Sequence, residues 1–158
     1  MTKFMCSEPV DFPYFRPRSG TVKRPLLWLY IENPHDENNQ GFRYPGLIDT
    51  GADRSMVPYT LFKELGHDFE AGHSPSQAGG IGKGTMRTYT HSARITVLAT
   101  PKDGKAGRTE DAVFFPIDMD LVFVEQSLPF ILLGQKDFQQ LFHYQQIRAE
   151  WKFSLRRI

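Results

Sequence analysis

The residues of this chain best suited to chemistry are an acid, a hydroxyl, a glycine and an alanine at positions 49–52. The apolar pair Leu47-Ile48 precedes them and predicts the end of a buried strand, while Gly51 permits a sharp loop. Such a strand would carry Asp49 into the interior, where a carboxylate must be hydrogen-bonded, paired or protonated because burying an isolated charge is very costly. Asp49 is therefore a candidate for acid–base chemistry, although Asp-Thr-Gly also occurs in ordinary Asx and Ser/Thr turns.

Two later stretches accompany this segment. Residues 78–85 are rich in glycine, and the apolar run 130–133 leads directly into Gly134. In this order and spacing, the three stretches resemble the active-site loop, the flap and the apolar-apolar-Gly segment of retropepsin-like aspartic proteases. The resemblance extends from about Leu26 to the C-terminus. It implies an aspartic endopeptidase that hydrolyses peptide bonds in extended peptide or protein substrates.

Peptide hydrolysis by carboxylates requires two of them, close enough to share one proton and hold one water. The chain contains a single Asp-Thr-Gly, and its other acids have no comparable context. A complete site therefore requires two copies of Asp49 across a two-fold axis, which predicts a homodimer. The resemblance implies that Thr50 braces the two loops across the dimer and that Gly51 bonds the substrate backbone.

The resemblance also implies a set of substrate-binding residues. These are Ala52 and Asp53 beside the acids, Gly80, Ile81 and Gly82 in the flap, and Ile131 as a pocket wall. In retroviral members, an arginine after the second motif's glycine pairs with the residue at the place of Asp53. Gln135 holds that place here, so Lys136 and Arg54 are the candidate replacements.

The elements that must position these residues follow from apolar and β-branched runs. Strands are predicted at 25–31, 42–48, 55–57, 112–117, 121–124, 130–133 and 147–155, helices at 59–65 and 135–144, and a loop at 67–77. Residues 85–98 are predicted to form one long strand or two linked strands, 85–90 and 91–98. This pattern predicts an all-β barrel or sandwich. The resemblance implies an acid-protease barrel with one short C-terminal helix, closed as a dimer. Residues 25–158 form the predicted protease domain, and residues 1–24 an N-terminal arm that lies on it.

Composition and charge further limit the kinds of partner and compartment that the chain suits. With 158 residues and a net charge of +1, the chain shows no nucleic-acid footprint, and its apolar runs are too short to span a bilayer. Cys6 is the only cysteine, and residues 1–23 lack the apolar core of a secretory signal. These features indicate a reducing compartment such as the cytoplasm.

No cofactor or metal is predicted. The histidines lack metal-ligand spacing, and the glycines around Lys83 do not match a phosphate loop, because Gln77 and Gly84 stand where that loop requires glycine and a hydroxyl residue.

Two alternatives to an active protease stay open. One is a dimeric peptide-binding module that keeps the groove but has lost turnover, although an intact Asp-Thr-Gly-Ala weighs against it. The other is a structural β-domain with a chance motif, which predicts a monomer indifferent to Asp49→Asn. Cleavage of peptides across pH, with and without a pepstatin-like inhibitor, separates the three.

Overall fold

The computed structural model describes residues 8–17, 20–38, 40–68, 73–79, 85–100, 105 and 111–158. Its elements in chain order are β1 (Val10–Pro13), β2 (Leu26–Glu32), β3 (Phe42–Ile48), β4 (Met56–Pro58), α1 (Tyr59–Glu64), β5 (His73–Gly79), β6 (Thr85–Leu98), β7 (Ile117–Val124), β8 (Ile131–Leu133), the 3₁₀ helix η3 (Gln139–Leu141), β9 (Phe142–Ile147), the 3₁₀ helix η4 (Arg148–Glu150) and β10 (Lys152–Arg157).

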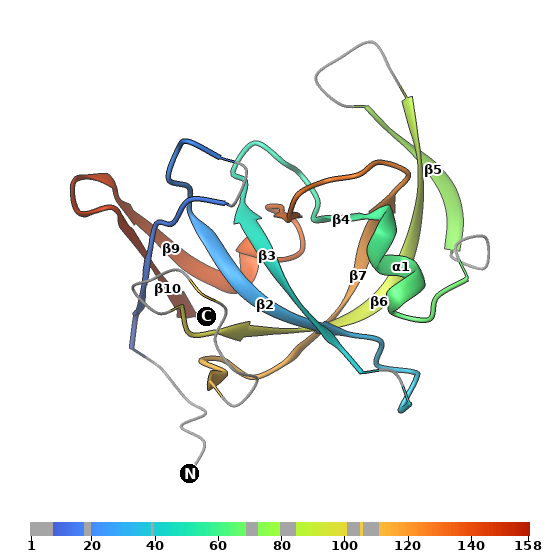
Figure 1. Cartoon of the computed structure of the whole chain (residues 1–158), viewed down its shortest axis with the longest axis horizontal. Helices are drawn as coiled ribbons and strands as arrows, with labels where there is room; N and C mark the ends of the chain where they lie inside the picture. The colour runs from blue at the N-terminus through green and yellow to red at the C-terminus, as the bar shows by residue number, and fades with distance from the viewer. Residues whose placement is uncertain are drawn as a thin grey trace.

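Six strands close into a barrel in the order β2-β3-β8-β4-β7-β6, with β2 and β6 completing the ring (Figure 1). The pairs β3–β8 and β4–β7 are parallel, and the other pairs in the ring are antiparallel. β5 extends the sheet beyond β6, and these two strands project from the barrel as a hairpin. The predicted all-β class is confirmed.

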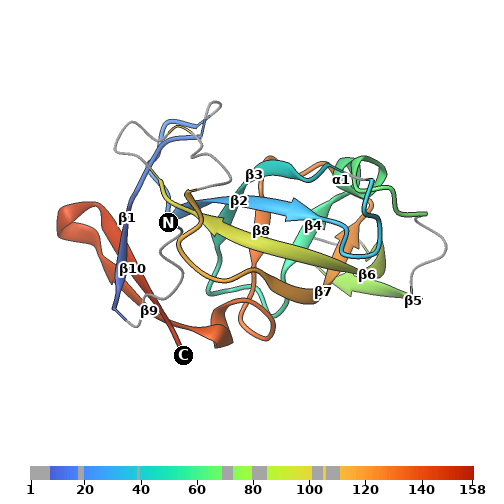
Figure 2. The same ribbon diagram turned by 90° about the horizontal axis from the view of Figure 1, so that it is seen from below.

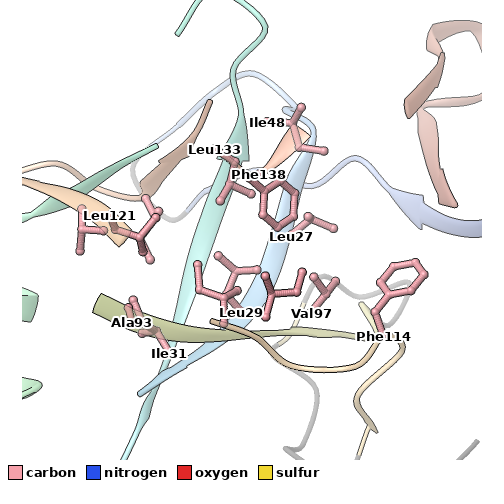
Figure 3. Packing of buried hydrophobic residues seen from close by; sticks show 14 of the residues in the cluster. Leu27, Leu29, Ile31, Ile48, Ala93, Val97, Phe114, Leu121, Leu133 and Phe138 are labelled. Atoms are coloured by element: carbon pink, nitrogen blue, oxygen red, sulfur yellow. The ribbon is translucent and has the colours of Figure 1, made fainter. Parts of the chain in front are cut away.

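The barrel forms because its strands alternate buried and partly exposed residues. In β2, Leu27, Leu29 and Ile31 are fully buried while the residues between them are not. Figure 3 shows these side chains meeting Ala93 and Val97 of β6 in the interior. Burying each large apolar side chain stabilises the fold by about 1.5–3 kcal/mol relative to exposure.

A second, three-stranded sheet in the order β1-β10-β9 lies beside the barrel (Figure 2). β1 belongs to the predicted N-terminal arm, and it pairs antiparallel with β10. Phe12 of β1 is fully buried and stacks on Phe153 of β10, with ring centroids 5.3 Å apart. The boundary between arm and domain at residues 24 and 25 stays a prediction.

The helix predicted at 135–144 is wrong. The segment contains only the short 3₁₀ helix η3, and β9 begins at Phe142; in the described part of the chain the one α-helix is α1, as predicted at 59–65. Phe138 and Phe142 are both buried, with ring centroids 5.0 Å apart. The spacing of apolar residues in this segment therefore identified core residues correctly, although the segment is not an α-helix. The pairing of β9 with β10 overrides the helical pattern.

Four further boundaries differ from the prediction. A single strand, β7, runs through Asp118 and Asp120, which both point outward, and Asp118 pairs with Arg94 of the neighbouring strand at 2.7 Å. Residues 112–116 form no strand; Ala112 makes an isolated bridge to Leu98, and Ile117 is the first residue of β7. The predicted loop 67–77 contains the start of β5, because the long strand β6 offers it a pairing edge. The predicted strand 147–155 is divided between β9 and β10 by η4.

Candidate active site

Strand β3 delivers Asp49 to one end of the barrel. Ile48 is buried, the Asp49 amide donates to the Leu133 carbonyl of β8 at 3.2 Å, and the Asp49 side chain is partly exposed. Asp49 Oδ1 accepts the Gly51 N–H at 2.9 Å, which is the geometry of an Asx turn. The expectation that a single chain buries this carboxylate in its interior is wrong, because the strand ends where the barrel ends.

The loop that follows, residues 49–55, is called here the Asp49 loop. The segment after β8, residues 133–139, holds its backbone at successive positions and is called the bracing segment. The hydrogen bonds, with the donor first, are Asp49 N to Leu133 O (3.2 Å), Gln139 Nε2 to Asp49 O (2.9 Å), Gln135 Nε2 to Thr50 O, Gln135 N to Ala52 O (2.9 Å) and Lys136 N to Asp53 O (2.8 Å). The Asp49 loop is therefore fixed by a segment distant in sequence.

The far end of the Asp49 loop is fixed by a carboxylate. The Asp137 oxygens accept the Ser55 N–H at 3.0 and 2.9 Å, and Oδ1 also accepts the Ser55 hydroxyl. Ser55 is fully buried, and its Oγ accepts the Gly134 N–H at 2.9 Å. Because an unsatisfied buried donor costs about 1–3 kcal/mol, this arrangement locks the two segments together.

Glycine is required at position 134. A Cβ there would lie 2.3 Å from the carbonyl carbon of Arg54 and 2.5 Å from its oxygen, which no side chain tolerates. The apolar-apolar-Gly motif thus ends in glycine because the bracing segment crosses the backbone of the Asp49 loop in direct contact.

Lys136 and Arg54, the predicted replacements for the family's arginine, lie near different acids. Lys136 Nζ lies 3.6 Å from Asp53 Oδ2, but both side chains are largely exposed, so this pair contributes little. Arg54 lies 3.7 Å from Asp137 instead of contacting Asp53. Asp53 is held mainly through its backbone carbonyl, which accepts the Lys136 N–H.

The structure brings some predicted site residues together and leaves others apart. Asp49, Thr50, Gly51, Ala52 and Asp53 share the Asp49 loop, with Thr50, Gly51 and Asp53 exposed and Ala52 half-buried. The predicted flap residues Gly80, Ile81 and Gly82 lie outside the described residues, although β5 and β6 on either side of them pair as a hairpin. Ile131 is fully buried in the core, and its role as a pocket wall stays a prediction.

Sequence reasoning missed four residues that hold the Asp49 loop: Ser55, Gln135, Asp137 and Gln139. Their partners lie far along the chain, and Gln139 and the carbonyl of Asp49 are separated by 90 positions. The one available signal was a cluster of polar residues just after the glycine of an otherwise apolar segment.

A pair of histidines forms a separate titratable cluster. His67, just after α1, stacks on His91 of β6 with ring centroids 4.7 Å apart, and both rings pack edge-on against Phe123. Burial, followed by the neighbouring His91 and His35, lowers the pKa of His67 to about 4 despite a hydrogen bond with the Ser92 backbone that acts the other way. His67 is therefore neutral in the folded protein at pH 7.

Among the described residues, no group of three or more His, Cys, Asp or Glu side chains is arranged to hold a metal ion. No helix in the described part of the chain has the length and apolar character needed to cross a bilayer.

No protein-family model matches the sequence, and no curated protein matches it significantly. Among solved structures, the chain is similar to a retropepsin-like aspartic protease from Rickettsia conorii, with a TM-score of 0.56 and 14% sequence identity over 94% of this chain and 91% of that one. The chain has the retropepsin-like fold.

Two other solved structures align less closely with this retropepsin-like chain. They are EIAV protease complexed with the inhibitor HBY-793 (TM-score 0.38, 24% identity, 72% of this chain and 84% of that one) and the retroviral protease-like domain of Ddi1 from Leishmania major (TM-score 0.44, 15% identity, 71% and 74%).

Proposed function

We propose that the protein is an aspartic endopeptidase whose active form is a homodimer, with each subunit contributing Asp49. The observation that carries the proposal is the position of Asp49: it ends a buried strand, its backbone is fixed by the bracing segment, and its carboxylate is partly exposed. A carboxylate fixed on rigid backbone yet open to solvent can meet a second carboxylate and a water. One chain supplies one such acid.

In this proposal the two Asp49 carboxylates share one proton, because like charges so close cannot both ionise. The ionised carboxylate takes a proton from the water, whose oxygen attacks the carbonyl carbon of the peptide bond. The protonated carboxyl donates a hydrogen bond to the carbonyl oxygen as negative charge develops there. Proton transfer to the nitrogen then releases the amine, and the new carboxyl product leaves.

The proposed substrate is an extended peptide that adds as a strand beneath the hairpin of β5 and β6. Gly51, Ala52 and Asp53 are the proposed contacts to its backbone, with Thr50 bracing the two loops across the dimer. Gly80, Ile81 and Gly82 are proposed to cover it, and Ile131 is the proposed pocket wall.

Asp49→Asn tests the proposal. Asparagine keeps the shape of the side chain but cannot take the proton, so we expect peptide cleavage to fall at least about a thousandfold with an unchanged fold and oligomeric state. Asp118→Asn is the matched control, because Asp118 lies exposed on β7 and pairs with Arg94 outside the Asp49 loop. Cleavage should be followed from pH 3 to 8 on a peptide library, with and without a pepstatin-like inhibitor.

Retained cleavage by the Asp49→Asn variant would overturn the mechanism. If the wild-type protein instead binds peptides at every pH without cleaving them, the peptide-binding module replaces the protease as the function.

A further inference from the structure

Gln139 makes a direct link to the backbone of Asp49. Its side-chain amide donates to two carbonyl oxygens, that of Asp49 at 2.9 Å and that of Leu133 at 2.6 Å. These carbonyls stand at the ends of β3 and β8, parallel strands in which Ile48 faces Leu133. A single side chain thus joins the two strand ends that meet beneath the candidate site.

The Gln139 side chain is itself held in place. Its backbone N–H donates to the Gly134 carbonyl at 2.9 Å, and the preceding residue, Phe138, is fully buried in the core beside Leu27 and Leu133 (Figure 3). Gln139 is partly buried. Its amide therefore reaches Asp49 from an anchored position and not from a mobile surface loop.

Asp49 makes backbone hydrogen bonds through both its N–H and its carbonyl, and Gln139 shares the acceptor oxygen of each. Its N–H donates to the Leu133 carbonyl at 3.2 Å, the same oxygen that Gln139 contacts, and its own carbonyl also accepts the Ala52 N–H at 3.2 Å. Without the amide of Gln139, the two carbonyls lose the donor that they share, and the link between the strand ends is weakened.

We propose that Gln139 is a positioning residue for Asp49, acting through the backbone carbonyl of the acid and not through its carboxylate. This inference rests on the proposed function, because positioning matters for catalysis only if Asp49 reacts. Paired acids that share a water must be held within about 0.5 Å of the productive geometry. Gln139 supplies that constraint through backbone carbonyls, so we expect its loss to lower turnover and to leave substrate binding little changed.

Gln139→Glu is the most informative variant, because it has the same shape but no N–H. When ionised, its carboxylate faces the two carbonyl oxygens and repels them; when protonated, it again donates to one of them. The ordinary pKa of glutamic acid is about 4.3, and the two facing carbonyl oxygens would raise it, so the defect should grow as pH rises above this value. Gln140→Glu is the matched control, because Gln140 lies on the same turn with an exposed side chain.

We expect kcat of Gln139→Glu to fall about tenfold or more relative to wild type at pH 6.5, with little change in KM. At pH 4 the ratio of variant to wild-type kcat should recover most of this loss. Gln139→Leu, which has no donor at any pH, should lose kcat at both pH values. Gln140→Glu should match wild type throughout.

Hydrogen exchange provides a readout that does not depend on activity. The Asp49 and Ala52 amides should exchange faster in Gln139→Leu at both pH values, and in Gln139→Glu at pH 6.5, while the amides shared by β6 and β7 stay protected. If the wild-type protein does not cleave peptides, the proposed function fails, and exchange at Asp49 still decides whether Gln139 positions it. Wild-type kcat in Gln139→Leu, or unchanged exchange at Asp49 in that variant, would overturn the inference.

Discussion

Replacement of Gly134 by alanine should destabilise the protein far more than an ordinary glycine-to-alanine change. The added Cβ would lie 2.3 Å from the carbonyl carbon of Arg54, whereas ordinary contact begins at 3.4 Å. Both groups are backbone or attached directly to it, so the bracing segment and the Asp49 loop must separate by about 1 Å. The 2.9 Å bond from Gly134 N to Ser55 Oγ, and the bonds to the carbonyls of Ala52 and Asp53, would then exceed hydrogen-bonding distance.

Each lost bond costs about 1 kcal/mol, so Gly134→Ala should lower the free energy of unfolding by about 3 kcal/mol. Gly46→Ala is the matched control: its Cβ would meet Leu29 Cδ1 at 2.7 Å and Leu133 Cδ1 at 3.0 Å, which are side-chain ends that can rotate away. We expect a cost of about 1 kcal/mol there. Urea unfolding at one fixed protein concentration compares the two variants with the same mass-action contribution from subunit association. A cost for Gly134→Ala no larger than that for Gly46→Ala would refute the close crossing of the two segments.

Two further predictions concern other parts of the chain. Because the pKa of His67 falls from 6.5 to about 4 on folding, the unfolded state binds more protons between these values, and stability should drop as pH falls from 6.5 to 4. The full shift corresponds to about 3 kcal/mol, and partial solvent contact reduces it to about 1–2 kcal/mol. Urea unfolding at pH 7 and pH 4 should show this loss of stability in the wild-type protein and a smaller loss in His67→Gln. An equal loss in both proteins would contradict the lowered pKa of His67. Phe12→Ala should cost about 3–5 kcal/mol because the ring is fully buried against Phe153, whereas Asp11→Asn on the exposed side of the same strand should change little. Equal unfolding midpoints for these two variants would show that β1 does not contribute to the core.

The parts of the fold that the sequence predicts are those specified by short-range patterns. The alternation of apolar residues in β2 and the apolar pair before Asp49 placed both strands correctly. Pro58 placed the start of α1, because proline suits the beginning of a helix and α1 begins at Tyr59.

The parts that sequence reasoning missed depend on contacts between distant residues. Asp118 lies within β7, near its start, and pairs with Arg94 on the neighbouring strand, a partner that no local pattern reports. The spacing of Phe138 and Phe142 fits a helix, yet both are buried through a 3₁₀ turn and the start of a strand.

The candidate site also has one part that the sequence predicts and another that it does not. The Asp49 loop can be recognised from its residue types, because an acid, a hydroxyl residue and a glycine stand directly after an apolar strand. The residues that hold it, Asp137 and Gln139, do so through bonds that span more than 80 positions, so their role follows only from the folded chain.

The most direct test of the account is a subunit-mixing experiment with wild-type protein and Asp49→Asn. Both should be denatured, mixed in varying proportions at constant total concentration, refolded together and assayed for peptide cleavage. If the site needs one Asp49 from each subunit, only wild-type homodimers are active, and activity should follow the square of the wild-type fraction. Activity that falls in direct proportion to the wild-type fraction would show that each chain carries a complete site of its own, and would contradict the shared pair of carboxylates.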